Sequence, residues 1–375
     1  MTTNADQDVT LLAVGDLFLR DEGSAPYLKP TADILSSGDI TFGNCEQPYA
    51  AHYPGVVPYF KSESGFDIMS FANNHILDYG NEAFLGTINL LESNGIACVG
   101  AGPDIVAARR PVVVESKGKK VAFLAYSSIQ VPSAAAGPGK PGCAPLRVHT
   151  AYHEQFEEYP GTPPQIRTFA HESDLNAICA DVRVAKELAD VVAVSLHWGP
   201  LLRFGELSEY QQGSAHAIID AGADIILGHH PHIMKPIEVY KGKVIFYSMG
   251  HFVMRTHAPV DTSYESAGQV TQSMVQRNIR TFRGEFGYDP EYPLYPFALN
   301  RDTLKTMIAK VTIGKGGISR VAFLPALIGT DYAPRVLEVA SQEFADVVTF
   351  LEHAGKENGI VTDLGVEGEE VVVRT

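Results

Sequence analysis

The chain has few cysteines and no long apolar run, and each scarcity excludes a class of protein. Its 375 residues include four cysteines, none in a CxxC pair, which excludes zinc-ribbon and thioredoxin-type sites. No stretch approaches the roughly 20 consecutive apolar residues that span a bilayer. The N-terminal residues lack the basic and apolar regions of a signal peptide. We therefore expect a cytoplasmic protein in a reducing compartment.

Positive charge is also scarce, and this limits the partners. Asp and Glu number 44 against 29 Lys and Arg, a formal net charge of −15. Nucleic-acid binding depends on Lys and Arg contacts to phosphates, and anionic membranes attract basic surfaces. We therefore expect neither nucleic acid nor membrane as a partner. A small-molecule or peptide substrate held through metal ions fits, because the field near a cation is local; a homo-oligomer is also compatible.

Several common catalytic fingerprints are absent. The sequence has no GxSxG elbow, no Walker A loop and no glycine-rich dinucleotide fingerprint after its first strand-like run. Its 45% hydrophobic and 19% charged residues are ordinary for a globular protein. A chain of this length can bury a large core, and we expect a single domain over residues 1–375.

Five short apolar runs each end in side chains that bind metals or do acid–base chemistry. They are LLAVGDLF with Asp16, ITFGNCEQP with Asn44 and Glu46, IMSFANNHILDYG with Asn73, Asn74, His75 and Asp78, VVAVSLHWG with His197, and DIILGHHPH with His229, His230 and His232. Short apolar runs between turn signals are typical of buried parallel strands. Ligands bind at the carboxyl ends of such strands. The pattern therefore predicts one metal site assembled by folding.

The segments between these runs predict helices and the rest of the fold. Helical spacing of apolar residues is found at 81–92, 173–189 and 206–222. His197 and His230 therefore end two strands joined by a helix, with their side chains at the same rim. The run KVIFYSMGH predicts one strand that ends near His251. Residues 304–314 and 317–329 predict a β-hairpin, and 334–351 a C-terminal helix.

The candidate ligands form a mixed nitrogen and oxygen set. In an extended segment, His230 and His232 would project to the same side and reach one ion or two adjacent ions. Together with Asp16, Glu46, Asn74 and His197 they suit two divalent transition-metal ions, Mn, Fe or Zn, better than Ca or Mg. Glu46 can bridge ions about 3.5–4 Å apart. Additional candidates are Asn44, Asn73 and His229, the last competing with His230. A lone histidine at a strand end is usually just hydrogen-bonded, but five such ends together favour a site.

These motifs resemble a known family. GDLFL, NCEQP, FANNHILDYG, SLHWG, GADIILGHHPH and VIFYSMGHF resemble the ordered motif series of the poly-γ-glutamate capsule biosynthesis (CapA-type) family, which is similar to calcineurin-like metallophosphoesterases. The resemblance runs from about Val9 to Phe252. It implies an α/β fold, a four-layer α/β-sandwich of the calcineurin-like metallophosphoesterase type, with a dinuclear metal centre at one rim. We expect the predicted β-hairpin and helix to follow it.

The resemblance also implies roles, and the sequence departs from the pattern twice. It implies that Asp16, Glu46, Asn74, His197, His230 and His232 are metal ligands, with Glu46 as the bridge and His75 beside the metal asparagine. The phosphoesterase D-x-H becomes Asp16-Leu17-Phe18, so one ion loses a histidine and its site is weaker or more open. The usual G-N-F of the capsule family is Gly250-His251-Phe252, which adds an imidazole near the rim.

The function that follows is metal-dependent hydrolysis. We expect a metal-activated water to cleave an amide, peptide or ester bond in an acidic or carboxylate-bearing substrate. His75, held by Asp78, would act as general acid or base, and His251 could act from the other side. Three alternatives stay open: a phosphoesterase, a metal-dependent peptide epimerase using His75 and His251, and a non-catalytic factor in capsule polyglutamate biosynthesis.

One long segment, 254–301, loses all periodicity. It contains Arg277, Arg280 and Arg283, which are out of character in an acidic chain. Guanidinium groups bind carboxylates in a bidentate fork. The segment therefore predicts an irregular substrate-binding lid, with a partner or dimer surface as the alternative.

Overall fold

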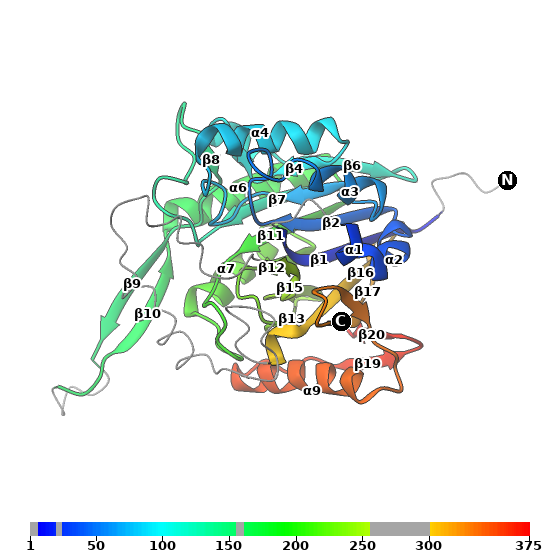
Figure 1. Ribbon diagram of the computed structural model, residues 1–375. Helices are drawn as coiled ribbons and strands as arrows, with labels where there is room; N and C mark the ends of the chain where they lie inside the picture. The colour runs from blue at the N-terminus through cyan, green and yellow to red at the C-terminus, as the bar shows by residue number, and fades with distance from the viewer. Residues whose placement is uncertain (1–6, 20–24, 155–160, 256–300) are drawn as a thin grey trace, which may run out of the picture.

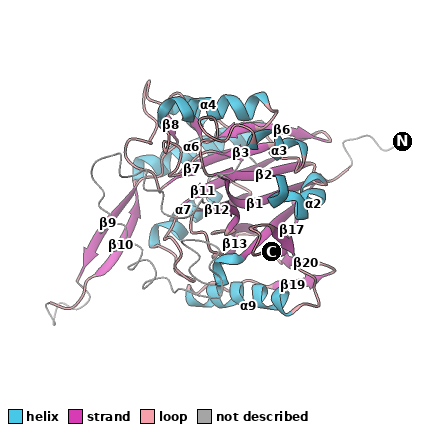
Figure 2. Cartoon of the chain, in the orientation of Figure 1, coloured by secondary structure: helices cyan, strands magenta, loops and turns pink. Residues whose placement is uncertain are grey.

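The computed structural model describes residues 7–19, 25–154, 161–255 and 301–375, which form two large β-sheets with helices around them (Figures 1 and 2). The larger sheet has ten strands in the order β19-β20-β17-β16-β1-β2-β3-β4, with β15 beside β1 and β18 beside β17. Its strands are β1 (Val9–Leu19), β2 (Ile40–Cys45), β3 (Ile68–Ser70), β4 (Ala97–Val99), β15 (His251–Arg255), β16 (Lys305–Gly314), β17 (Gly317–Ile328), β18 (Pro334–Val336), β19 (Leu364–Glu367) and β20 (Glu370–Val373).

The smaller sheet has six strands in the order β13-β14-β12-β11-β7-β6. They are β6 (Val112–Ser116), β7 (Lys119–Ser127), β11 (Val191–His197), β12 (Ile225–His229), β13 (Ile237–Tyr240) and β14 (Lys243–Phe246). The central pairs β7–β11 and β11–β12 are parallel, as expected for buried apolar runs.

The two sheets pack face to face and carry helices on their outer sides. Phe42 of β2 stacks on Phe123 of β7 at 5.6 Å in the core between the sheets. Gly43, the next residue, faces Phe66 on the opposite side of the larger sheet, where Phe66 packs on Phe60 of α3 (Val56–Ser62). On the smaller sheet, α6 (Glu172–Leu188) and α7 (Glu209–Asp220) enclose a second core. The expected four-layer α/β-sandwich is confirmed.

The remaining helices match the sequence expectations in part. The helix expected at 81–92 is α4 (Gly80–Ser93), which packs Phe84 on Phe71. The other short elements are α1 (Ala25–Leu28), η2 (Lys29–Thr31), α2 (Ala32–Ser36), β5 (Ala101–Gly102), α5 (Ile105–Arg109), β8 (Gly142–Cys143) and η4 (Arg301–Leu304). No helix among the described residues is long and apolar enough to cross a membrane.

The C-terminal region contains the expected hairpin, but its helix begins later than expected. β16 and β17 pair antiparallel over ten residue pairs. The helix predicted from Pro334 is α9 (Gln342–Glu357), because Ser341 is its N-cap and accepts a hydrogen bond from the Phe344 amide. Pro334 instead begins β18, which pairs with the end of β17. α9 contacts both β17 and β13 and so lies across both sheets.

The run KVIFYSMGH is not one strand. β14 belongs to the smaller sheet and β15 to the larger, so the chain crosses between sheets at residues 247–250. Gly250 has a positive φ of 76°, and its carbonyl oxygen lies where a Cβ on Gly15 would be, 2.0 Å from that position. The crossing places His251 beside Asp16 in the β1–β15 pair.

The sequence did not predict a hairpin that stands apart from the two large sheets. β9 (Val148–His153) and β10 (Gln165–Ala170) pair antiparallel and form a separate two-stranded sheet. This hairpin extends away from the sandwich beyond α7 (Figure 1). Pro163 lies in the segment between its two strands.

Candidate metal centre

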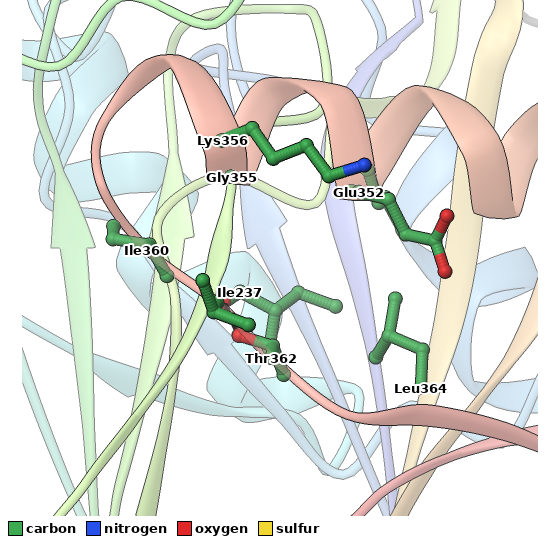
Figure 3. A pocket seen from close by; sticks show the side chains of 9 residues that line it. Ile237, Glu352, Gly355, Lys356, Ile360, Thr362 and Leu364 are labelled. Atoms are coloured by element: carbon green, nitrogen blue, oxygen red, sulfur yellow. Dashed lines mark hydrogen bonds between the residues drawn. The ribbon is translucent and has the colours of Figure 1, made fainter.

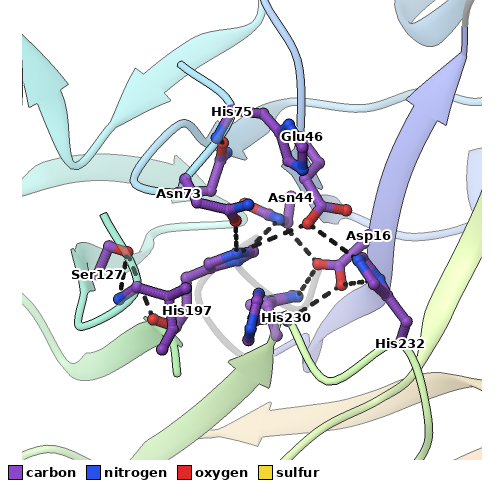
Figure 4. Close-up of polar contacts among 12 residues, drawn as sticks. Asp16, Asn44, Glu46, Asn73, His75, Ser127, His197, His230 and His232 are labelled. Carbon is purple, nitrogen blue, oxygen red and sulfur yellow. Dashed lines mark hydrogen bonds and ion pairs between the residues drawn. The ribbon is translucent and has the colours of Figure 1, made fainter. Parts of the chain in front are cut away.

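The predicted strand ends converge at one rim, between the two sheets (Figure 4). Asp16 in β1 is the register partner of both Asn44 in β2 and His251 in β15. On the smaller sheet, His197 ends β11 and is the register partner of His229 at the end of β12. The remaining candidates follow their strands directly: Glu46 after β2, Asn73, Asn74 and His75 after β3, and His230 and His232 after β12.

Two groups of side chains have ligand atoms within 4.8 Å of one another. One group is Glu46, His197 and His230, and the other is Asp16, Glu46 and His232. Glu46 belongs to both groups, as a bridging carboxylate would. The Asn74 Oδ1 atom lies 2.7 Å from His197 Nε2, so the amide oxygen adjoins the first group. All six residues predicted as ligands from the sequence therefore lie close together in the structure.

His230 and His232 reach the two groups by a route that the sequence did not suggest. The segment is not extended, because His230 and His232 have positive φ values of 93° and 53°. Non-glycine residues adopt such values rarely, and often at functional sites. The backbone bend sends His230 to the first group and His232 to the second. The expectation of two imidazoles on one side of an extended strand was therefore wrong.

Buried polar atoms test whether the centre fits a metal. Glu46 is fully buried, yet neither carboxylate oxygen has a hydrogen-bond partner among the described residues. His230 Nδ1 likewise has none. The Glu46 Oε1 atom lies 3.6 Å from His197 Nε2 and 3.5 Å from His232 Nε2. Burying a carboxylate without hydrogen bonds is costly. A cation among these nitrogen and oxygen donors would remove that cost, so the residues fit a metal.

Burial sets the protonation states of the donors. Burial raises the pKa of Glu46 well above its usual value, and repulsion from Asp16 and Asp78 adds to the rise. Burial lowers the pKa of His197 well below its usual value and, with repulsion from His232, lowers the pKa of His230 to about 3. Both imidazoles are therefore neutral at physiological pH, which is the form that binds metals.

Asp16 is held in place by surrounding donors. Its carboxylate accepts hydrogen bonds from Asn44 Nδ2 at 2.8 Å and from the His230 amide at 3.1 Å. Nδ1 of His229 and Nδ1 of His232 lie 3.3 and 3.2 Å from its oxygens. Burial raises the pKa of Asp16, but these histidine contacts outweigh burial and hold the pKa well below its usual value. Asp16 is thus an oriented carboxylate before any ion binds.

The three additional candidates, Asn44, Asn73 and His229, support this arrangement. Asn44 directs its amide NH₂ toward Asp16 and lies 3.4 Å from His197 Nδ1. Asn73 donates to the Cys45 carbonyl and accepts from the His75 amide, so it joins the loops after β2 and β3. His229 is fully buried with its Nδ1 toward Asp16.

The predicted acid–base pair is His75 and Asp78, and His75 lies beside the centre (Figure 4). His75 Nδ1 is 2.9 Å from Asp78 Oδ2, and the His75 side chain is 30% exposed. The pair sits in a turn before α4 rather than in a helix, with the Asp78 amide donating to the His75 carbonyl. The Phe18 ring packs edge-on against His75 at 5.2 Å. These contacts orient the imidazole through Nδ1.

His251 is buried behind His232. Its Nδ1 lies 3.2 Å from the His232 carbonyl oxygen, and the two rings are 5.9 Å apart. Burial, with repulsion from His232, lowers the pKa of His251 to about 3. The His251 imidazole, which replaces the asparagine of the G-N-F motif, is thus neutral and contacts the backbone of the candidate ligand His232. The three arginines proposed for substrate binding, Arg277, Arg280 and Arg283, lie outside the described residues.

Sequence reasoning missed the residues that hold the loops of the rim. Ser127 is the register partner of His197, and the Ser128 amide donates to the His197 carbonyl. The Tyr210 hydroxyl lies 2.7 Å from Ser128 Oγ and accepts from the Gly199 amide at 2.8 Å. Serine and tyrosine at strand and helix ends carry no distinctive spacing, so no sequence signal could have identified them.

Three pockets lined by described residues lie away from this centre. One of about 180 Å³ lies beneath α9 and is lined by Ile237, Leu351, Lys356, Ile360 and Leu364, among others (Figure 3). Two others, of about 260 and 300 Å³, also contain none of the candidate ligands.

The fold and the site together define an α/β-sandwich protein with a histidine- and carboxylate-rich centre. Residues 10–256 match the family described as bacterial capsule synthesis protein PGA_cap. The match covers more than half of the chain, so the chain belongs to this family, as its motifs indicated.

Named relatives agree with this membership. The PGA biosynthesis protein CapA of Bacillus subtilis is 28% identical over 274 residues, 67% of this chain and 64% of that protein. The capsule biosynthesis protein CapA of Bacillus anthracis is 33% identical over 66% of this chain and 60% of that protein. A probable polyglutamine synthesis accessory protein of Mycobacterium tuberculosis is 34% identical over 50% of this chain and 44% of that protein. The similarity thus spans less than two thirds of these relatives.

Proposed function

We propose that this protein is a metal-dependent hydrolase that holds two divalent transition-metal ions, Mn, Fe or Zn, at the rim. The observation that carries the proposal is Glu46, which is fully buried, lacks hydrogen bonds and belongs to both donor groups. Asn74, His197 and His230 would complete one ion site, and Asp16 and His232 the other. The second set has fewer donors, in keeping with the D-x-H histidine that Phe18 replaces.

The chain's own residues supply orientation and proton transfer. Bound ions would polarise the scissile group and make a water nucleophilic at neutral pH. His75, oriented by Asp78 through Nδ1, would give a proton to the leaving group through Nε2. Neutral His251 would hold the His232 backbone, and Asn44 would hold the Asp16 carboxylate.

The proposed substrate is an amide, peptide or ester with carboxylate groups. Two relatives are named for PGA or capsule biosynthesis, which supports an acidic polymer or a fragment of one. Arg277, Arg280 and Arg283 are the proposed carboxylate-binding residues. Hydrolysis of amides or esters is favoured over phosphoesters because the D-x-H histidine is missing.

A second candidate function is a non-catalytic factor in polymer synthesis. It is favoured by the name of the Mycobacterium tuberculosis relative, an accessory protein. A factor of this kind would still bind metal, but it would turn over none of the substrates below.

The first experiment measures metal content after reconstitution, by elemental analysis. We expect about two ions per chain in the wild type, about one in His230→Ala and in His232→Ala, and the largest loss in Glu46→Gln. His353→Ala, at a residue 63% exposed on α9, is the matched control and should retain both ions. Full metal content in Glu46→Gln would exclude the proposed bridge.

The second experiment separates the activities. The reconstituted protein is incubated with polyglutamate, peptides, and p-nitrophenyl esters and phosphates, and the products are weighed by mass spectrometry. Hydrolysis adds the mass of water across the bond, whereas epimerisation leaves the mass unchanged. Cleavage of phosphates alone would favour the phosphoesterase, and a metal-loaded protein inert on every substrate would favour the accessory factor.

A further inference from the structure

Within the described parts of the chain, one edge of the β9–β10 hairpin has no strand beside it. Among the described strands β9 pairs only with β10, and every side chain from His149 to His153 is exposed. Tyr152 and Ile166 face each other across the pair and are 73% and 63% exposed. An isolated two-stranded sheet is marginally stable in water. A further strand on the free edge would therefore stabilise the hairpin.

The base of the hairpin is firmly held, so the edge has a fixed direction. Arg147, just before β9, binds the Asp174 carboxylate through Nε at 2.7 Å and Nη2 at 2.6 Å. On β10, Arg167 pairs with Glu209 at 2.7 Å, and Thr168 Oγ1 accepts from the Tyr210 amide. β10 thus lies along α7, and β9 is the strand that faces outward.

β9 lacks the protection that other edge strands of this chain have. Proteins block strand edges with charges, prolines or short length. The edge strands of the two large sheets follow this rule: β4 has three residues, while β6, β13 and β19 carry Glu115, Glu238 and Glu367. β9 is six residues long and contains no Lys, Arg, Asp, Glu or Pro. Its edge is therefore suited to pairing.

We infer that β9 pairs antiparallel with β9 of a second copy of this chain, forming a four-stranded sheet across a two-fold axis. Two copies that each carry a net charge of −15 repel one another, and an uncharged strand is where they can approach most closely. An axis at Thr150 sets Tyr152 opposite Val148 of the second copy, and an axis at Ala151 sets it opposite Thr150. Both are aromatic and β-branched pairs, which stabilise sheets. The inference is independent of the proposed hydrolase activity.

The test is the solution mass of the full chain by light scattering over a range of concentrations. We expect the wild type to approach twice the 40.6 kDa of one chain. Thr150→Lys places two lysines near the axis and should return the mass to that of one chain. Val366→Lys is the matched control, since Val366 is 51% exposed on edge strand β19, and it should associate like the wild type. A wild type that is monomeric throughout, or a Thr150→Lys dimer as strong as the wild type, overturns the inference.

Cross-linking tests the geometry independently of affinity. Under mild oxidation Ala151→Cys should form a disulfide-linked dimer, because residue 151 lies at the axis in one of the two registers and next to it in the other. Gln165→Cys, on β10 and away from the axis, should not. Equal cross-linking of the two variants would show that the copies do not meet at β9.

Discussion

At the scale of single residues, the two carboxylates of the centre differ in what already surrounds them. Asp16 receives two hydrogen bonds and two histidine contacts, whereas Glu46 has no hydrogen-bond partner among the described residues. Asp16 is thus oriented by protein donors, whereas the buried Glu46 lacks them, and a cation would offset the cost of burying it. The distinction follows from position, since the amide of Asn44 and the backbone of His230 both reach Asp16 and neither reaches Glu46.

The first prediction concerns His75. His75→Ala should lower turnover about 10²-fold or more, as for the loss of a general acid or base, while metal content stays near two ions. His52→Ala is the matched control, since His52 is an exposed histidine of the neighbouring loop whose ring packs on Tyr79. Steady-state kinetics and elemental analysis on the same samples check both parts. Wild-type turnover in metal-loaded His75→Ala would remove this residue from the mechanism.

How far the site could be predicted depends on whether a residue has a sequence signal. Asp16, Glu46, His197 and the two histidines around Pro231 follow apolar runs, and strand ends that share a rim must meet. The supporting contacts of Ser128 and Tyr210 depend on tertiary distances between segments 82 residues apart. The positive φ values of His230 and His232 were equally unpredictable, because a histidine in the sequence does not indicate a left-handed backbone as a glycine does.

At the scale of elements, the close approach of the Gly250 carbonyl to the backbone of β1 shapes the rim. The carbonyl of Gly250 fills the space where a side chain on Gly15 would stand, and Asp16 comes next in β1. The Asp16 amide donates to that same carbonyl at 3.3 Å. The glycine in β1 therefore lets the chain cross from β14 to β15 and bring His251 to the centre.

The second prediction uses this contact. Gly15→Ala forces the β15 segment away and should destabilise the protein by about 1–3 kcal/mol, as overpacking does, and also reduce metal content. Gly213→Ala is the matched control, because Gly213 is exposed in α7 with nothing near its Cβ position. That change should instead stabilise the helix by about 0.5–1 kcal/mol. Denaturant unfolding measures both, and equal stability of the two variants would contradict the close approach.

The third prediction concerns the ion pair at the hairpin base. Burial raises the pKa of Asp174, but the Arg147 guanidinium outweighs burial and the pKa lies below its usual value. A lowered folded-state pKa gives stability that is present above the unfolded value near 3.9 and is lost as pH falls through the folded value. Asp174→Asn should therefore cost about 1 kcal/mol at pH 7, since Arg147 is largely exposed, and flatten the acid side of the stability curve.

The matched control for that pair is Asp331→Asn. The pKa of Asp331 is lowered to about 2, chiefly by its hydrogen bonds to Arg335, yet both side chains are more than half exposed. Solvent screening should leave the stability of this variant nearly unchanged. Urea unfolding between pH 3 and pH 7 compares the two variants, and identical curves would show that burial of Asp174 does not matter.

The elements that the sequence predicted well are those with one buried environment along their length. β1, β7, β11 and β12 are mainly apolar and are buried along almost their whole length, and α4 and α7 have clear helical spacing. The prediction that KVIFYSMGH forms one strand was wrong because residues 247–250 are as buried as the strands they join. The burial pattern of the run therefore could not show the change of sheet. The β9–β10 hairpin was not predicted for the opposite reason. Both of its faces are largely exposed, so its sequence has no alternation of apolar and polar residues that would indicate strands.

At the scale of the whole molecule, the candidate ligands come from both sheets. Asp16 and Glu46 belong to the larger sheet, and His197, His230 and His232 to the smaller. Each donor group contains residues of both sheets. An ion in either group would therefore cross-link the two halves of the sandwich, in addition to the apolar core between Phe42 and Phe123. Metal binding would therefore be coupled to global stability in this arrangement.

The last prediction follows from that coupling and from the burial of Glu46. Burial raises the folded-state pKa of Glu46, so the metal-free fold loses stability as pH rises above the unfolded value, and Glu46 is unfavourable near pH 7. A bound ion would reverse this effect, and at a free concentration 100 times its dissociation constant it would add about 2.7 kcal/mol to the free energy of unfolding.

Glu46→Gln keeps the shape of the side chain without its charge. Its chelated form should unfold at a higher temperature than the chelated wild type, and added metal should raise its midpoint less. Calorimetry of four samples, each protein with and without metal, measures both differences. A Glu46→Gln protein that is less stable than the wild type without metal, and equally stabilised by added metal, would show that Glu46 is a structural carboxylate rather than the ligand shared by two ions.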